Sequence, residues 1–319
     1  MTVRIVLRHR RALRRVAITG LVAGLTMLGL AAVPAVASAA PAEQSSDGAA
    51  RFAWFEDATI TPGVMISSPL GNCTSSFVFT DGDDVFLSSA AHCGVTEDAG
   101  RSLNGCVEPV FPVGTELTIV GTDGTRTAGT LAYSSWGAMQ SNEETDPTLC
   151  NFNDFALVEL DPADIDIVNS SVPVFGGPTR LDTDGTESGE DVFTYQPNRH
   201  PGAAAKQGIG MGQPDGPWSH RVATTPPSEE GGSGAGYLDA GGEAFGLLSF
   251  GFEQGTPSAG IDGVTDIALA VDYAIDNGDL GKIALVPGTV AFSTDGVQSS
   301  LLPELLPVEL PVRLTPVPL

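Results

Sequence analysis

Three polar residues lie in sequence contexts that suit nucleophilic catalysis. His92 follows an apolar run, Asp154 precedes another, and Ser233 lies in the glycine-rich segment 231–234. A nucleophilic serine needs a base that takes its proton, and the base needs an acid that fixes its tautomer. Glycines beside the serine allow backbone N–H groups to converge on a developing oxyanion. The order His, Asp, Ser is one of the orders known for this triad.

Each of the three residues also has a simpler interpretation. A lone histidine at a strand end is more often structural, an acid before a strand is usually a solvated turn residue, and G-G-S-G is typical of a flexible linker. The acids Asp81, Asp83 and Asp84 resemble calcium ligands in type, but they lack the EF-hand pattern, which favours a solvated turn. The combination of the three residues, rather than any one, indicates catalysis.

The elements that must position these residues are short β-runs. The 39 glycines and 23 prolines suit many strands joined by turns. Residues 75–80 and 83–88 are β-rich and flank Asp81-Gly82, which predicts a hairpin. Further strands are predicted at 115–120, 155–160 and 244–250, and one helix near 267–277. Residues 161–173 are expected to connect two β halves.

The amino terminus has the organisation of an export signal. A basic head, residues 1–15, is followed by an apolar run, residues 16–36, and then by the small residues Ala37-Ser38-Ala39-Ala40. This order predicts a signal peptide over residues 1–39, and the glycines and late proline favour cleavage over a membrane anchor. The pairs Arg10-Arg11 and Arg14-Arg15 leave a twin-arginine export route open.

The charge balance restricts the partners of the chain. Its 319 residues include 15 Lys and Arg against 39 Asp and Glu. Six of the basic residues fall in the first fifteen positions, so the remainder has nine basic residues and a net charge of −30. Nucleic-acid backbones and anionic membrane surfaces both select for Lys and Arg. We therefore expect neither nucleic acid nor, after signal removal, a membrane as partner.

Cysteine usage agrees with export. The four cysteines are Cys73, Cys93, Cys106 and Cys150, and no C-x-x-C spacing occurs, which argues against a zinc site. An even number in an exported chain favours two disulfides. The spacing alone leaves all three connectivities open.

Four motifs together resemble those of the trypsin-like (chymotrypsin-fold) serine proteases, especially the secreted bacterial branch. Ser89-Ala90-Ala91-His92-Cys93 is similar to the family's T-A-A-H-C, Asn153-Asp154-Phe155-Ala156-Leu157 to D-I-A-L, Gly231-Gly232-Ser233-Gly234 to G-D-S-G, and Ser249-Phe250-Gly251 to S-W-G. The resemblance covers about residues 62–281.

The resemblance implies a fold and a set of roles. The fold is all-β, with two antiparallel β-barrels and a short C-terminal helix. His92 would be the general base, Asp154 its orienting acid and Ser233 the nucleophile, with the N–H groups of Gly231 and Ser233 as oxyanion hole. Substrate would contact Pro227, Ser249, Phe250 and Gly251. The resemblance also implies a disulfide between Cys73 and Cys93, with Cys106 paired to Cys150.

These implications set the expected domain organisation. The protease domain would span residues 52–285, with barrel one at about 60–165 and barrel two at about 172–285. Residues 286–319 would form a tail, because five prolines among its last twenty residues suit neither a helix nor a central strand.

Two departures from the family pattern carry predictions. Gly232 stands where the family has aspartate, and no I-V-G-G start follows the signal, so both halves of the usual activation switch are missing. We expect activity without N-terminal processing beyond signal removal. Pro227 stands where Arg- and Lys-specific members have aspartate, which predicts weak preference for basic side chains, although Glu229 and Glu230 could attract one.

The sequence thus predicts a secreted, extracellular serine endopeptidase that acts through an acyl-enzyme on protein or peptide substrates. We expect no cofactor, no metal and a monomer. The alternatives are a catalytically inactive binding or adhesion module on the same fold, motivated by Gly232 and the acidic surface, and a secreted esterase with the same triad.

Overall fold

Two antiparallel β units make up the described chain. The computed structural model describes residues 52–96, 103–197, 204–251, 260–278 and 280–297. All of them belong to a single compact part of the chain, Ser46–Leu319, and the two β units are its halves. The strands of the first unit are β1 (Met65–Ser68), β2 (Gly71–Thr74), β3 (Val78–Asp81), β4 (Asp84–Ser89), β5 (Glu116–Val120), β6 (Arg126–Ser134), β7 (Ala156–Leu160) and β14 (Ala284–Leu285). Those of the second unit are β8 (Asp191–Tyr195), β9 (Ala205–Gly210), β10 (Ser219–Thr225), β11 (Gly236–Leu238), β12 (Ala244–Gly251) and β13 (Ile261–Asp266).

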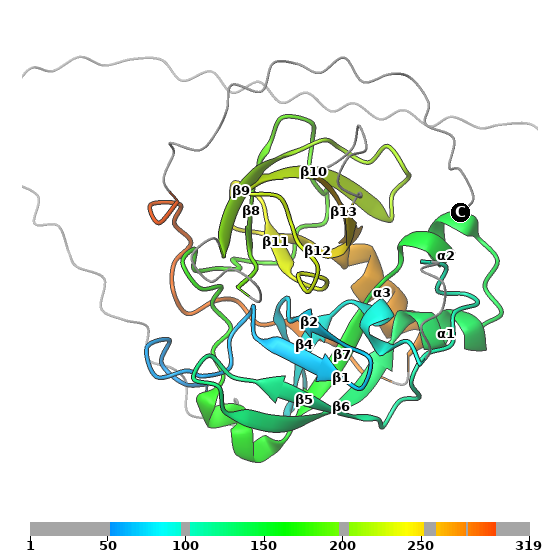
Figure 1. The fold of residues 1–319 in the computed structure, drawn as a ribbon, viewed down its shortest axis with the longest axis horizontal. Coiled ribbons are helices and arrows are strands. Elements are labelled where there is room, and N and C mark those ends of the chain that lie inside the picture. The colour runs from blue at the N-terminus through cyan, green and yellow to red at the C-terminus, as the bar shows by residue number, and fades with distance from the viewer. Residues whose placement is uncertain (1–51, 97–102, 198–203, 252–259, 279, 298–319) are drawn as a thin grey trace, which may run out of the picture. The chain divides into compact units, whose positions relative to one another are not determined.

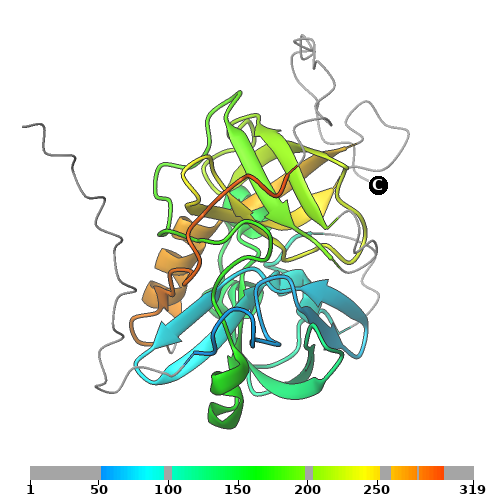
Figure 2. The ribbon, with the colours of Figure 1, turned by 90° about the vertical axis from the view of Figure 1, so that its left-hand side faces the viewer.

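The helices are few and short. They are α1 (Ser135–Ser141), α2 (Pro147–Phe152), α3 (Ile267–Asn277) and the 3₁₀ turns η1 (Ala91–Gly94) and η2 (Pro162–Ile167). Figures 1 and 2 show the two β units one above the other, with α3 lying alongside both.

The structure confirms the predicted all-β class and refines the description of the first unit. The second unit is a closed barrel in the order β10-β13-β12-β11-β8-β9. The first is an eight-stranded sheet in the order β14-β3-β4-β7-β6-β5-β1-β2, whose edges within the described chain are β14 and β2. Strand β14 follows α3 and pairs with β3, so the end of the chain returns to the first unit.

The predicted hairpin at Asp81-Gly82 is present between β3 and β4. Asp81 pairs with Asp84, and Gly82 has a φ of +62°, a conformation that glycine adopts without strain. Five of the six residues of β4 are buried, because Val85 and Leu87 enter one hydrophobic core while Phe86 enters another. A strand that is buried on both faces has a continuous apolar run in place of alternating polar and apolar residues. Strand β4 is such a strand, and it fixes the start of the segment that leads to His92.

Helix α3 occupies the stretch predicted from sequence. Asp266 caps it by accepting a hydrogen bond from Leu269 N–H, and His220 Nε2 lies 3.0 Å from the other oxygen of the same carboxylate. His220 is fully buried in the second unit and ties β10 to the start of α3. It therefore has a structural position, while His200 lies outside the described residues.

Residues 286–297, which the sequence analysis groups with the tail, pack against the connection between the two units. Thr289 Oγ1 is hydrogen-bonded to Asn169 and Ser171, and Gly177 N–H donates to the carbonyl of Val290 at 2.9 Å. Phe292 lies edge-to-face on Phe193 at 5.7 Å. The packed chain thus continues beyond residue 285, and residues 298–319 lie outside the described part.

The proposed signal peptide, residues 1–39, also lies outside the described residues. Within the described ranges, none of the helices has the length and apolar character needed to cross a bilayer.

Candidate active site

The structure brings His92 and Asp154 together. His92 lies in η1, directly after β4, and Asp154 precedes β7, which pairs with β4. The His92 Nδ1 atom is 2.6 Å from Asp154 Oδ2, and the backbone N–H of His92 donates to Asp154 Oδ1 at 2.8 Å. Asp154 is buried, whereas 20% of the His92 side chain is exposed. The carboxylate thus fixes the plane of a ring that still reaches solvent.

Opposing effects set the pKa values of this pair. Burial acts to lower the pKa of His92, but the charge of Asp154 and the hydrogen bond to it raise that pKa above its ordinary value of 6.5. Burial likewise acts to raise the pKa of Asp154, but His92 and the hydrogen bonds that the carboxylate accepts hold it below its ordinary range. An ionised Asp154 accepts a hydrogen bond from the Nδ1–H group, so the ring proton stays on Nδ1 and Nε2 is the basic nitrogen.

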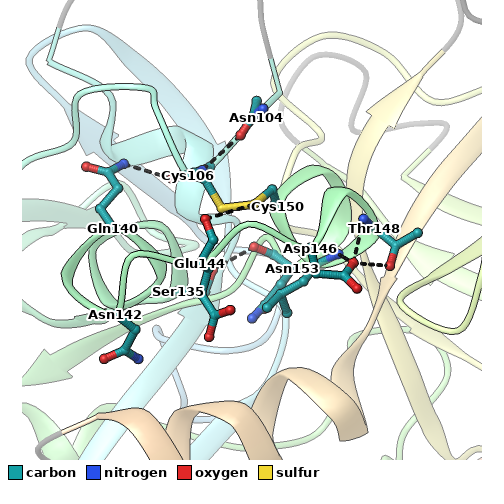
Figure 3. Close-up of a disulfide and its surroundings, with 12 residues drawn as sticks. Asn104, Cys106, Ser135, Gln140, Asn142, Glu144, Asp146, Thr148, Cys150 and Asn153 are labelled. Carbon is teal, nitrogen blue, oxygen red and sulfur yellow. Dashed lines mark hydrogen bonds between the residues drawn. A yellow bond between two sulfur atoms is a disulfide. The ribbon is translucent and has the colours of Figure 1, made fainter.

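Ser135 at the start of α1 fixes the backbone on both sides of Asp154. Its hydroxyl donates to the carbonyl of Asn153 at 2.8 Å and accepts from Phe155 N–H at 3.0 Å. The segment before Asp154 is also fixed by the disulfide between Cys106 and Cys150, of which Cys150 lies in α2 (Figure 3). These contacts reduce the freedom of the acid that must orient His92.

The Ser249 hydroxyl also points at Asp154. It donates to Oδ2 at 2.5 Å, and Ser249 is buried near the end of β12. The sequence analysis places Ser249 among the substrate contacts, and the contact observed for its side chain is this one. Because β12 belongs to the barrel and Asp154 to the first sheet, the bond joins the two β units at the site.

Ser233 lies in a turn that docks on the first sheet. The carbonyl of Ser233 accepts from Thr74 N–H at 2.8 Å, and the Thr74 hydroxyl donates to the carbonyl of Gly231 at 2.8 Å. Gly234 has a φ of +88°, and a Cβ there would lie 2.3 Å from Ser89 Oγ and 2.9 Å from the backbone nitrogen of Ala90. Only glycine permits this close approach to the strand that leads to His92.

The Ser233 side chain itself makes no hydrogen bond to His92 in the described chain. Nucleophile–base contacts in enzymes without substrate are often long and shorten when substrate binds. The N–H group of Ser233 also donates to none of the described acceptors.

Cys73 and Cys93 form a disulfide beside His92. The connectivity is the one that the resemblance implies for both cysteine pairs. Among the described residues, Cys73, His92 and Cys93 have the spacing of metal ligands, but sulfur atoms joined in a disulfide offer no thiolate to a metal.

The remaining predicted substrate contacts differ in their surroundings. Pro227 is exposed, and its carbonyl accepts from Lys206 Nζ at 3.0 Å. Phe250 stacks on Phe152 at 6.0 Å and lies under the Arg221 guanidinium at 4.9 Å. Gly251, the last residue of β12, is exposed.

Sequence reasoning missed the polar side chains that support the site. Ser135 holds the acid and Thr74 holds the serine turn. Behind that turn, the half-buried Ser228 is hydrogen-bonded to the buried side chains of Gln196 and Asp262. Serine, threonine and glutamine occur throughout the chain, so no local pattern distinguishes these positions.

Comparisons with known proteins give structural neighbours only. No family model matches the chain, and no curated protein matches it. Among solved structures, Thermobifida fusca protease A aligns at 19% identity with a TM-score of 0.45, covering 72% of this chain and all of that one. Cellulomonas bogoriensis chymotrypsin aligns at 16% identity with a TM-score of 0.42, covering 72% of this chain and 98% of its own. A glutamic acid specific serine protease aligns at 18% identity with a TM-score of 0.42, covering 71% of this chain and 100% of its own.

The observed architecture is an antiparallel sheet unit that carries the histidine and aspartate and an antiparallel barrel whose chain carries the serine. With identities and TM-scores this low, any functional conclusion has to come from the site itself.

Proposed function

We propose that this protein is a secreted serine endopeptidase. The single observation that supports this most is the His92–Asp154 pair, in which a buried carboxylate 2.6 Å from Nδ1 leaves Nε2 basic on a partly exposed ring. His220 also lies beside a carboxylate but is fully buried, so the partial exposure of the His92 ring is what suits it to act as a base. The serine turn then lies beside the same strand end.

The proposed mechanism gives each of these residues one role. Ser233 Oγ attacks the peptide carbonyl while His92 Nε2 takes its proton, and Asp154 stabilises the imidazolium that forms. The N–H groups of Gly231 and Ser233 stabilise the oxyanion of the tetrahedral intermediate. His92 then protonates the leaving amine, and water hydrolyses the acyl-enzyme by the same steps in reverse.

The rest of the proposal concerns substrate and location. The substrate is a protein or peptide. We propose that the enzyme has only a weak preference for cleaving after Arg or Lys. The buried carboxylate of Asp262 lies near Pro227, but Ser228, Tyr237 and Thr224 already donate to it. A protease domain over about residues 52–285 that residues 286–297 extend, a signal over 1–39 and a monomeric extracellular protein complete the proposal.

The test is hydrolysis of a matched pair of peptide substrates, one with a chromogenic amide and one with the corresponding ester. We expect the purified chain to cleave both, Ser233→Ala to cleave neither, and Ser141→Ala, a change at an exposed serine of α1, to match the wild type. Ester cleavage without amide cleavage would indicate an esterase. No turnover of either substrate would favour the inactive module.

A further inference from the structure

A buried polar cluster lies behind the serine turn and has no part in the proposed triad. Its members are Gln196, Ser228, Tyr237 and Asp262, of which Gln196, Tyr237 and Asp262 are 6%, 0% and 2% exposed. Gln196 follows β8, Ser228 precedes the serine turn, Tyr237 is in β11 and Asp262 in β13. The cluster therefore joins three strands of the barrel to the segment that carries Ser233.

The hydrogen bonds of the cluster lead, from donor to acceptor, toward the carboxylate of Asp262. An ionised carboxylate only accepts, so the hydroxyls of Ser228 and Tyr237 donate to Asp262 Oδ2 at 2.7 and 2.9 Å. Ser228 Oγ can then accept from Gln196 Nε2 at 2.9 Å. On the other side of Ser228, Lys206 Nζ donates to the carbonyl of Pro227 at 3.0 Å. Residues 227 and 228 are thus held from within the barrel.

The second polar atom of Gln196 faces the turn itself. A Cβ built on Gly232 would lie 3.0 Å from Gln196 Oε1, and this oxygen is buried without a hydrogen-bond partner. Gln196 therefore occupies the space into which a side chain at position 232 would project. Leaving a buried acceptor unpaired costs free energy, on the order of 1–3 kcal/mol, so the bonds of Nε2 must hold the amide in this place.

The turn in contact with Gln196 determines where an oxyanion donor points. Gly232 N–H donates to the carbonyl of Glu229 at 3.0 Å, which closes a β-turn. Its third residue, Gly231, has a φ of +90°, as a type II turn requires. Types I and II differ by a flip of the central peptide, whose N–H belongs to Gly231, so the turn type sets the direction of that N–H.

We propose that Gln196 is a positioning residue that, through Ser228 and its contact with Gly232, holds the 229–232 turn in the form that presents the Gly231 N–H to the oxyanion. This inference rests on the proposed function. Gln196 would be an uncharged support for the turn, at the point where Gly232 replaces the aspartate of the G-D-S-G motif. This support requires no new N-terminal amine.

The test compares the single variants Gln196→Met and Gln207→Met with the wild-type protein. Methionine keeps the length of the side chain and removes its hydrogen bonds, and Gln207 lies in β9 without a side-chain hydrogen bond to any described residue. Loss of one oxyanion donor typically lowers kcat by about 10²–10³-fold, so partial loss of turn order should lower it by about 10- to 100-fold. We expect KM to change by less than about twofold, because the donor acts mainly on the transition state.

A peptide aldehyde provides the second readout. Ser233 Oγ adds to its carbonyl carbon, and the resulting hemiacetal oxygen occupies the oxyanion position. Its affinity should fall for Gln196→Met in proportion to kcat and stay unchanged for Gln207→Met. A purely structural role for Gln196 would instead lower the melting temperature and leave kcat and aldehyde affinity of the folded protein unchanged, which would overturn the proposal.

Should Gln196→Met not fold, Ser228→Ala removes the partner of Gln196 and should show the same pattern more weakly. If neither variant folds, the cluster serves the fold and the proposal is overturned. Wild-type protein that cleaves no peptide and binds no aldehyde would contradict the proposed function, whereas active wild type with unaffected Gln196→Met contradicts only this inference.

Discussion

Replacing Asp154 by asparagine keeps the shape of the side chain and removes its charge and one acceptor. Asp154 Oδ1 accepts from the His92 N–H, and Oδ2 accepts from both His92 Nδ1 and Ser249 Oγ. An amide cannot accept at both positions. With its nitrogen in place of Oδ2, it donates to Nδ1 and moves the ring proton to Nε2. With its nitrogen in place of Oδ1, it faces the N–H of His92, which is also a donor.

The orientation that avoids two facing donors at the backbone therefore produces the wrong tautomer. A His92 ring protonated at Nε2 cannot take the Ser233 proton. Changing the tautomer in a Ser-His-Asp triad costs about 10⁴-fold in kcat, or about 5.5 kcal/mol of transition-state stabilisation. We expect a loss of this size in kcat for Asp154→Asn.

The assay is steady-state hydrolysis of a chromogenic peptide amide by Asp154→Asn and by Asp191→Asn, a change at the exposed first residue of β8. Melting temperatures of both variants establish that each is folded under assay conditions. The control should retain wild-type kcat. A loss below about tenfold for folded Asp154→Asn would refute the assigned role, because an ordinary hydrogen bond contributes only about 1 kcal/mol.

Five further predictions concern other parts of the molecule. Because Asp154 raises the pKa of His92 above 6.5 and the base must be neutral, the acid limb of kcat/KM should have its midpoint above pH 6.5; a midpoint below 6.5 would contradict the pairing. The same raised pKa stabilises the fold below pH 6.5, and this contribution should disappear as the pH rises through the folded value. Replacing Cys106 and Cys150 by serine opens a loop with a sequence separation of 44, so chemical denaturation should show a loss of about 4 kcal/mol, and an unchanged midpoint would argue against the constraint. Gly234→Ala forces a Cβ to 2.3 Å from Ser89 Oγ at a φ of +88° and should cost about 2 kcal/mol or more of stability along with most activity; wild-type melting and turnover would show that the turn docks differently. Chains beginning at Ala40 and at Arg51 should have similar activity on a general protease substrate, whereas activity that arises only after one defined cleavage would reject the activation prediction.

Strong local signals in the sequence predicted four strands of the first sheet, β3, β4, β5 and β7, but only β12 of the barrel. The Asp-Gly turn fixed the β3–β4 hairpin, and alternating residues in β5 place Leu117 and Ile119 in the core. Helix α3 lies at the predicted residues, and in the structure Asp266 caps it while six of its residues are buried. Helices α1 and α2 were missed, since seven and six residues are too few for a periodic pattern.

The candidate site was predicted to the extent that its residues lie in recognisable motifs. His92 and Asp154 do lie together, while Ser233 reaches the same strand end through the docking of its turn on Thr74. Ser135, Gln196 and Ser228 act through contacts made across long sequence separations. Such contacts depend on the packing of whole strands, so no short window of sequence contains them. The described contacts of residues 286–297 were missed for the same reason.

Mapping the site of a fluorophosphonate adduct tests the central claim, that Ser233 is a nucleophile activated by His92. The Oγ atom of an activated serine displaces fluoride from phosphorus, and peptide mass spectrometry identifies the modified residue. We expect the wild-type protein to be labelled at Ser233, with labelling abolished in Ser233→Ala and in His92→Ala. Labelling of another residue in the wild type, or no labelling of folded protein, would contradict the account.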